Sequence, residues 1–357
     1  MLLISLFGTG FALYLFSTNQ NTNQGTPMQR SPLAAAALTF SILTGFATTG
    51  HAAIGLTAAG TALNLTLDTV VTGFPSSSTI GPLGIVFPAG GGMLVSDYAG
   101  NLYTFSSTAP GQTAAGAASV QSYPASGIIG MTMSGGQIYG ADRFAGAIDL
   151  LSNTGAVQST LTTLSGPTGM ATNPINGHLY VSTSAGIYDV DPATGSTTLI
   201  VAGNFDGLTV SPDGKHLYAA NAANGVDIVE YATGVNGAPA VALEHTFHID
   251  DTVDGTALGT GAFAGDLFIN TNSGNIWEYD TNTDTLVKLA TGGSRGDFVA
   301  VDSSGVLYIT QSDSIVSLTA PSGASFSSTT DAPEPTSLAI LGAALAGLGL
   351  SRKRRRA

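Results

Sequence analysis

The stretch LTVSPDGKHLYAAN at residues 208–221 contains two short apolar runs on either side of a turn sequence. The residues between them, Pro212, Asp213 and Gly214, favour a tight turn that joins antiparallel strands. A third run at residues 226–231, VDIVEY, is rich in the β-branched and aromatic residues that favour strands. The stretch therefore predicts three consecutive strands of one antiparallel sheet.

The same layout occurs six times in the chain: an entry with glycine, an apolar strand, a turn, a strand ending in Leu-Tyr or similar, a polar loop and a third strand. A period of about 40 residues with three or four short strands is typical of a β-propeller. We therefore predict an all-β fold, a six-bladed β-propeller, over residues 61–326. The corresponding glycines are expected at Gly84, Gly130, Gly169, Gly207, Gly255 and Gly296, with intervals of 46, 39, 38, 48 and 41 residues.

The sixth repeat lacks a convincing fourth strand. An alternating segment, Leu63 to Val71, precedes the first repeat. We predict that this N-terminal segment completes the last blade and closes the ring, which removes exposed sheet edges. Closure matters here because the chain has no cysteine, so disulfides cannot stabilise the domain.

Charge is distributed very unevenly along the chain. Residues 53–332 contain four basic and 22 acidic residues, a net charge of −18. This excludes nucleic acid as a partner, because nucleic-acid binding needs basic residues to replace counterions. Cation binding and simple solubility are both compatible with the acidic domain.

The N-terminal region has the pattern of a secretory signal peptide at residues 28–52. Arg30 precedes an apolar run from Leu33 to Phe46, and the small residues Gly50 and Ala52 place cleavage after Ala52. This segment predicts an N-terminal signal helix. We interpret residues 1–27 as a mis-called extension upstream of the true start at Met28; a genuine extra hydrophobic segment is the alternative.

The C-terminal region combines a Pro-Glu-Pro motif with a short apolar run and a basic cluster. We predict a linker at 327–336 that contains Pro333, Glu334 and Pro335, followed by a hydrophobic helix and tail at 337–357. A helix of about 13 apolar residues spans about 20 Å, less than the bilayer core of about 30 Å. Basic residues that flank a membrane segment stay in the cytoplasm. In this chain the basic residues after the apolar run are Arg352, Lys353, Arg354, Arg355 and Arg356.

This order resembles the PEP-CTERM sorting signal over about 25 residues. The resemblance implies processing by an exosortase-type protease near the Pro-Glu-Pro motif, in bacteria that make exopolysaccharide. The protein would be anchored in the inner membrane as a precursor and then reach the cell surface or the extracellular space. A plain C-terminal membrane anchor would have the same topology. Residues 208–221 also resemble YVTN and NHL repeats, and the array is similar in architecture to gluconolactonase-like proteins and streptogramin lyases.

In a propeller, the loop entering the inner strand and the loop leaving the second strand lie on one face. Acidic and amide side chains in these loops predict a Ca2+ or Mg2+ site at one mouth of the channel. The similarity to gluconolactonase-like proteins implies a metal there, but this chain lacks their full ligand pattern. The alternative is that these side chains only stabilise turns, and that they recur because the repeat recurs. The candidates are Asp97, Asp142, Asp206, Asn221, Asp254, Asn270 and Asp297.

Two other groups carry weaker signals. Asp280, Asn282 and Asp284 are spaced like the start of a calcium loop but lack the glycine that follows in such loops, so we expect an outer-strand turn. His245 and His248 lie in an alternating segment, which places them on opposite faces of a solvated outer strand. Common hydrolase and nucleotide-binding motifs are absent from the sequence.

We therefore predict an exported surface or extracellular-matrix protein with a binding or structural role, and assign no catalytic residue. Its expected partners are the exosortase-type protease, the inner membrane before processing and exopolysaccharide. The alternative is a metal-dependent lactonase or lyase that acts at the channel mouth. A divalent ion bound there with an open coordination position would favour the enzyme.

Overall fold

The computed structural model describes residues 53–123, 127–234 and 242–326. The predicted signal helix, the extension at 1–27 and the whole C-terminal tail lie outside these residues, as do Pro333, Glu334, Pro335 and the basic cluster. Within the described residues, no helix has both the length and the apolar character needed to cross a membrane.

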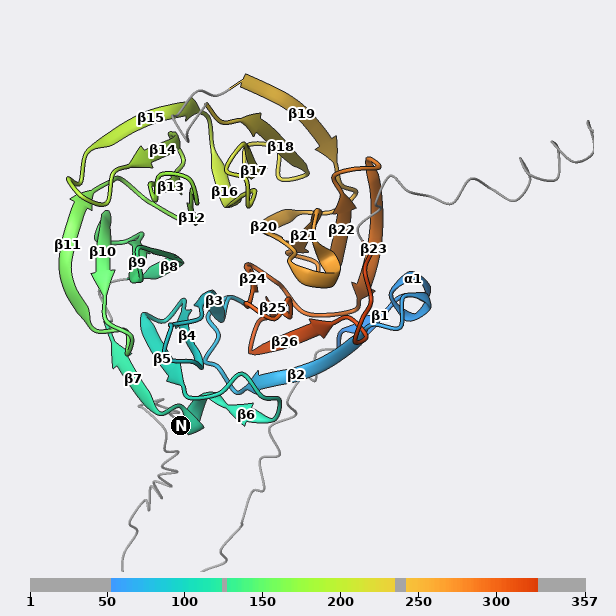
Figure 1. The fold of residues 1–357 in the computed structure, drawn as a ribbon. Helices are drawn as coiled ribbons and strands as arrows, with labels where there is room; N and C mark the ends of the chain where they lie inside the picture. Colours follow the sequence, from blue (N-terminus) through green and yellow to red (C-terminus); the bar gives the residue numbers. More distant parts are fainter. Residues whose placement is uncertain (1–52, 124–126, 235–241, 327–357) are drawn as a thin grey trace, which may run out of the picture. The chain divides into compact units, whose positions relative to one another are not determined.

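Six sheets surround a central axis and form a six-bladed β-propeller (Figure 1), as the repeats predict. Blade 1 contains β3 (Pro82–Val86), β4 (Met93–Asp97), β5 (Asn101–Phe105) and β7 (Ser119–Ser122). Blade 2 contains β8 (Ile128–Ser134), β9 (Gln137–Asp142), β10 (Ala147–Leu151) and β11 (Val157–Thr163). Blade 3 contains β12 (Met170–Thr172), β13 (Leu179–Ser182), β14 (Gly186–Val190) and β15 (Thr197–Ala202).

The other three blades follow the same order from the axis to the rim. Blade 4 contains β16 (Phe205–Val210), β17 (His216–Asn221), β18 (Asp227–Ala232) and β19 (Ala242–His248). Blade 5 contains β20 (Val253–Leu258), β21 (Asp266–Thr271), β22 (Ile276–Asp280), β23 (Thr285–Thr291) and the short β1 (Gly55–Leu56). Blade 6 contains β24 (Val299–Val301), β25 (Leu307–Thr310), β26 (Ser314–Thr319), β2 (Thr66–Thr72) and β6 (Gln112–Thr113). Short helices occur at α1 (Ala58–Ala62), η1 (Ala114–Gly116) and η3 (Gly261–Phe263).

The N-terminal strand closes the ring. Strand β2 pairs with β26 in antiparallel register from Thr66 opposite Thr319 to Thr72 opposite Ser314. Val70 and Val71 in β2 are fully buried. The prediction that the segment before the first repeat completes the last blade is therefore confirmed, and blade 6 joins the two ends of the propeller chain.

The hydrophobic core lies between blades rather than within them. Each of the six core clusters combines residues from two neighbouring blades. For example, Tyr139 and Ile148 of blade 2 pack with Leu179 and Val181 of blade 3. A four-stranded blade therefore buries both of its faces only when it has a neighbour on each side, which explains why ring closure is needed.

Glycines allow the inner strands to approach closely around the axis. A Cβ atom on Gly207 would lie 2.5 Å from the carbonyl oxygen of Asp254, and one on Gly255 would lie 2.2 Å from that of Asp297. The Cβ of Gly255 would also meet the Cα of Phe298 at 2.6 Å, so Phe298 holds the sixth ring position. The assignment of Gly296 to this position was wrong, because its added Cβ would instead meet the side chain of Asn270 at 2.0 Å.

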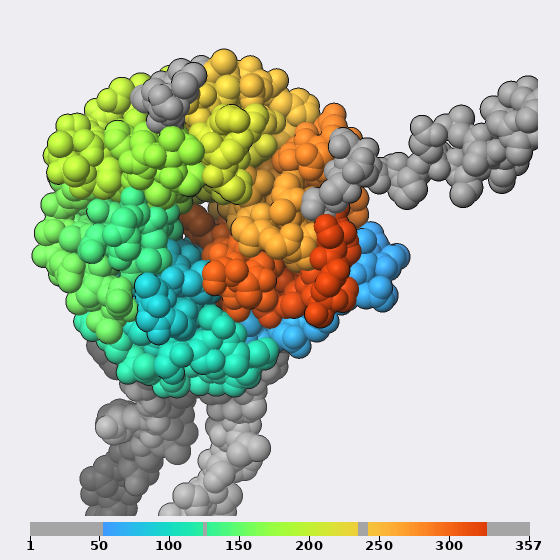
Figure 2. Space-filling model, viewed as in Figure 1, coloured from blue at the N-terminus to red at the C-terminus, as the bar shows by residue number. Residues whose placement is uncertain are grey.

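A cavity of about 790 Å3 occupies the axis on the side of this glycine ring where the inner strands end. Figure 2 shows the hollow at the centre of the ring. Its wall includes Met131, Met133, Met170, Leu208 and Val299, with threonine hydroxyls between them. The other mouth of the channel, where the inner strands begin, carries acidic side chains instead.

Candidate functional site: the acidic mouth of the channel

Three carboxylates lie at the start of the inner strands of blades 4, 5 and 6. Asp206, Asp254 and Asp297 each come directly before a ring position, and we call these three residues the acidic crescent. The equivalent positions in blades 1 to 3 hold Leu83, Ile129 and Thr168. The acidic groups therefore cover one half of this mouth.

Arg295 supplies the crescent with a positive charge. Its Nη2 atom lies 2.7 Å from Oδ1 of Asp297 and 3.3 Å from Oδ2 of Asp254, and its Nε donates to Asp297 at 3.0 Å. Both aspartates are buried, whereas the arginine side chain is 30% exposed. Arg295 thus neutralises part of the charge that burial would otherwise make very unfavourable.

Burial has the largest effect on the pKa values of Asp206 and Asp254. It raises the pKa of Asp206 to about 6; the charge of Asp297 adds to this effect, while Arg143 and Arg295 oppose it. Burial also raises the pKa of Asp254 well above its usual value, and the charges of Asp206 and Asp297 add to the effect. Arg295 again acts in the opposite direction. Asp206 and Asp254 therefore take up protons at a higher pH than solvated carboxylates do.

Three of the other predicted ligands already accept hydrogen bonds in turns. Asp97 accepts from the backbone N–H of Asn101 at 2.8 Å and from the hydroxyl of Tyr103 at 2.9 Å. Asp142 accepts from the backbone N–H groups of Gly127 and Ala145 at 3.1 and 2.9 Å. These bonds fix the turns that follow the second strands on the mouth face. Asn221 similarly accepts from the backbone N–H of Ala223 at 3.1 Å.

Asn270 connects two blades. Its Nδ2 atom donates to the carbonyl oxygens of Phe298 and Thr310, at 3.1 and 3.0 Å, and the residue is fully buried. The strand register places Thr271, not Asn270, at the position that Asn221 holds in blade 4, because Val253 faces Thr271 as Phe205 faces Asn221. A ligand role for Asp97, Asp142, Asn221 and Asn270 stays a prediction.

An aromatic pair on the same face was missed by the sequence reasoning. The rings of Tyr98 and Phe144 meet edge to face with centroids 5.9 Å apart, and Phe144 is 54% exposed. Both residues come one or two positions after a turn aspartate, Asp97 or Asp142, and that spacing is the signal that was available in the sequence. The charge of Arg143, next to Phe144 in the chain, lowers the pKa of Asp206.

The two weaker groups lie on the outer strands. Asp280 accepts from the backbone N–H of Asn282 at 2.8 Å in the turn between β22 and β23, the outer-strand turn that was expected. His245 and His248 lie on the outer strand β19, also as expected. Their partners differ: His245 contacts the hydroxyl of Tyr279 at 3.1 Å, and His248 pairs with Asp227 at 2.9 Å.

A buried carboxyl group lies at the opposite end of blade 5. Asp266, the first residue of β21, is fully buried, and neither of its carboxyl oxygens has a hydrogen-bond partner among the described residues. Burial raises its pKa to about 8, and the charges of Glu278 and Asp280 contribute further. The folded protein therefore keeps Asp266 protonated at a pH where the unfolded chain would ionise it.

This difference predicts a stability that falls as the pH rises. The stability contributed by protonated Asp266 is fully present below pH 3.8, its unfolded value, and is lost as the pH rises through about 8. The slope is up to about 1.4 kcal/mol per pH unit in this window. Urea unfolding between pH 5 and 8 should show a flatter slope for Asp266→Asn than for the wild type. Exposed Asp213→Asn serves as the control, and parallel curves for wild type and Asp266→Asn would contradict the assignment.

Comparison with known proteins provides independent evidence on the fold and on the C-terminal tail. Residues 331–355 match the PEP-CTERM protein-sorting motif. No curated protein matches the chain. Among solved structures, a gluconolactonase from Xanthomonas campestris is similar, with 16% identity and a TM-score of 0.60 over 75% of this chain and 95% of that one.

Two further structures agree with this fold. A putative gluconolactonase has 15% identity and a TM-score of 0.57 over 72% of this chain and 92% of that one. A calcium-binding regucalcin from Agrobacterium tumefaciens has 16% identity and a TM-score of 0.54 over 70% and 95%. The fold is thus that of a six-bladed β-propeller like the gluconolactonases. In this chain, the propeller is followed by a PEP-CTERM sorting motif.

Proposed function

We propose that this protein is exported and acts as a glycan-binding propeller at the cell surface or in the extracellular matrix, with exopolysaccharide as its ligand. The observation that carries the proposal is the Tyr98–Phe144 pair, with an exposed Phe144 ring, on the same face as the acidic crescent. A propeller fold alone is shared by enzymes and binding proteins, so the site must carry the argument.

The chemistry of this face suits a sugar. An exposed aromatic ring offers an apolar surface against which the C–H face of a sugar ring can pack. Carboxylates accept hydrogen bonds from hydroxyl groups, and the guanidinium groups of Arg143 and Arg295 donate them. Because Arg295 already pairs with Asp254 and Asp297, the mouth favours a polar neutral ligand over a free cation.

The tail supports delivery to the cell exterior. The PEP-CTERM motif at residues 331–355 suggests export and processing by an exosortase-type protease. In this proposal, the apolar run and the arginine cluster hold the precursor at the inner membrane until cleavage near Pro335 releases the propeller. The tail then only directs the protein to the cell exterior, and the glycan binds at the channel mouth.

Co-sedimentation of the exported protein with exopolysaccharide from the producing bacterium tests the proposal. We expect Phe144→Ala to weaken binding about tenfold, or about 1.4 kcal/mol, because the stacking surface is lost. Ile175→Ala is the matched control, since Ile175 is also exposed, at 51%, but lies in the turn between β12 and β13 at the other end of the propeller. Equal binding of wild type and Phe144→Ala, or no co-sedimentation of the wild type, would contradict a glycan site at this mouth.

A metal-dependent lactonase or lyase is the second candidate. The gathering of three carboxylates at one mouth favours it, because oxygen ligands suit Ca2+ or Mg2+. The four histidines in the described residues pair with carboxylates or a tyrosine, so none of them marks a general base at the crescent. Lactone hydrolysis that depends on added Ca2+ and is lost in Asp254→Ala would favour the enzyme over the binding protein.

A further inference from the structure

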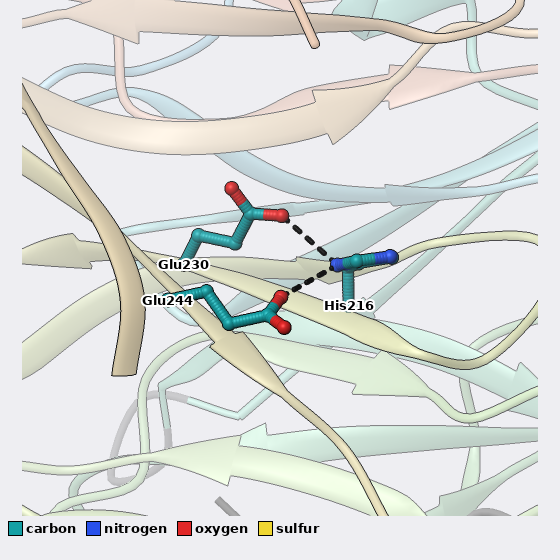
Figure 3. Close-up of side chains that lie close together, drawn as sticks. All are labelled: His216, Glu230 and Glu244. Atoms are coloured by element: carbon teal, nitrogen blue, oxygen red, sulfur yellow. Dashed lines mark hydrogen bonds and ion pairs between the residues drawn. The ribbon is translucent and has the colours of Figure 1, made fainter. Parts of the chain in front are cut away.

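Three neighbouring strands of blade 4 bring a histidine and two glutamates together, away from the acidic mouth. His216 begins β17, Glu230 lies in β18 and Glu244 lies in β19, and Figure 3 shows the three side chains pointing toward one another. Nδ1 of His216 lies 2.9 Å from Oε1 of Glu230 and 3.0 Å from Oε2 of Glu244. We call these three residues the blade 4 triad.

The triad has more negative charge than its single imidazole can satisfy. Nδ1 of His216 carries at most one hydrogen, yet it faces an oxygen from each of two carboxylates. The three ligand atoms all lie within 4.8 Å of one another, so the carboxylates repel each other. Burial strengthens this repulsion, because the side chain of Glu230 is only 14% exposed.

The surrounding structure holds the triad in place. All three residues lie on hydrogen-bonded strands of one sheet, where side-chain positions are better fixed than on loops. The hydroxyl of Tyr218 donates to Oε1 of Glu230 at 3.0 Å, which orients that carboxylate from behind. A hydrogen bond of this kind from outside the ligand set is common at metal sites.

We propose that the blade 4 triad binds a divalent transition-metal ion, with Zn2+ as the best-fitting example. One imidazole nitrogen and two carboxylate oxygens provide three protein ligands and leave a fourth position for water. The imidazole favours a transition metal over Ca2+ or Mg2+, which prefer oxygen ligands. The site lies at the opposite end of the blade from the acidic crescent, so it goes beyond the proposed glycan binding and does not depend on it.

Blade 3 provides an internal comparison. His178 comes just before β13 as His216 begins β17, and its Nδ1 lies 2.8 Å from Asp189. The outer strand of that blade, β15, has the sequence TTLIVA and so supplies no acidic third ligand. His178 therefore has one carboxylate partner where His216 has two, and it makes a matched control.

Titration of the chelator-treated exported protein with Zn2+ tests the site. Isothermal titration calorimetry should give one Zn2+ per chain, and Zn2+ should raise the thermal midpoint because it binds the folded state. Co2+ should give visible absorption bands from a site of low coordination number. We expect His216→Ala and Glu244→Gln each to weaken Zn2+ binding at least tenfold and to abolish the Co2+ bands, whereas His178→Ala keeps both.

Two outcomes would overturn the proposal. The first is a wild type that takes up no stoichiometric Zn2+, and the second is unchanged affinity in Glu244→Gln. Glu244→Gln keeps the test valid if His216→Ala fails to fold, because the Glu244 side chain is 40% exposed and the amide has the same shape. Loss of glycan binding with intact Zn2+ binding would count only against the proposed function.

Discussion

Replacing Val71 by aspartate is expected to lower the free energy of unfolding by at least about 4 kcal/mol, or to prevent folding altogether. Val71 is fully buried in β2, opposite Ile315 of β26, and packs in the core cluster between blades 6 and 1. A charge at this position has no partner and separates the strand that joins the two ends of the ring. Urea unfolding followed by near-ultraviolet circular dichroism measures the loss.

The neighbouring residue supplies the control. Thr72 is exposed in the same strand, so Thr72→Asp should change the unfolding free energy by no more than about 0.5 kcal/mol. Val71→Ala should fall between the two, because it removes apolar volume without adding a charge. A Val71→Asp protein as stable as Thr72→Asp would show that β2 does not hold the ring closed.

Arg295→Met is expected to cost about 3 to 5 kcal/mol at pH 7, the cost of leaving a buried charge without its partner. The variant removes the hydrogen bonds to Asp297 and Asp254 and one of the two arginines that lower the pKa of Asp206. The pKa values of Asp206 and Asp254 would then rise further above those of the unfolded chain. The loss of unfolding free energy relative to the wild type should therefore become smaller as the pH falls and the carboxyl groups take up protons.

A second substitution identifies the cause of this loss. Asp254→Asn in the Arg295→Met background should restore part of the stability, because it removes one of the uncompensated charges. Lys215→Met is the control for a lost surface ion pair, since Lys215 is 73% exposed and its partner Asp213 is 51% exposed. Such a pair contributes about 0 to 1 kcal/mol. If the stability loss of Arg295→Met is independent of pH and Asp254→Asn does not reduce it, uncompensated carboxylate charge is not its cause.

The architecture was predictable because its signals are local. The turn at Pro212 to Gly214 acts within a few residues of chain, and the glycines repeat at a period of about 40 residues that can be counted along the sequence. The closing role of β2 followed from counting strands and finding one spare segment before the first repeat. The sixth ring position was missed because Phe298 replaces the glycine there, and the nearby Gly296 took its place in the alignment.

The site was less predictable because its contacts are long-range. Asp206 and Asp254 are marked by the glycine that follows them, but Arg295 meets Asp254 across 41 residues. Asn270 was placed one residue out of register, and a shift of one residue moves a side chain to the other face of a strand. Asp97 and Asp142 were grouped with the crescent because of their place in the repeat. In the structure, both carboxylates accept hydrogen bonds from backbone N–H groups.

The blade 4 triad depends on strand register that the sequence does not specify. The register of β18 and β19 places His245 opposite Glu230, and the β-bulge that follows this pair leaves Glu244 as the extra residue of β19. This register brings Glu244 to His216, which precedes it by 28 residues. In the sequence, Glu244 is adjacent to His245 and far from His216. Cross-strand pairing, rather than sequence spacing, is what assembles the three ligands.

The proposed function requires that the propeller is exported and that the tail is removed once it has directed the protein out of the cell. Intact-mass measurement of the protein recovered from outside the cell tests this most directly. It should give a chain that begins at Ala53 and ends near Pro335, without the basic cluster from Arg352 to Arg356. Recovery of an external protein that still carries Arg352 to Arg356 would contradict the account.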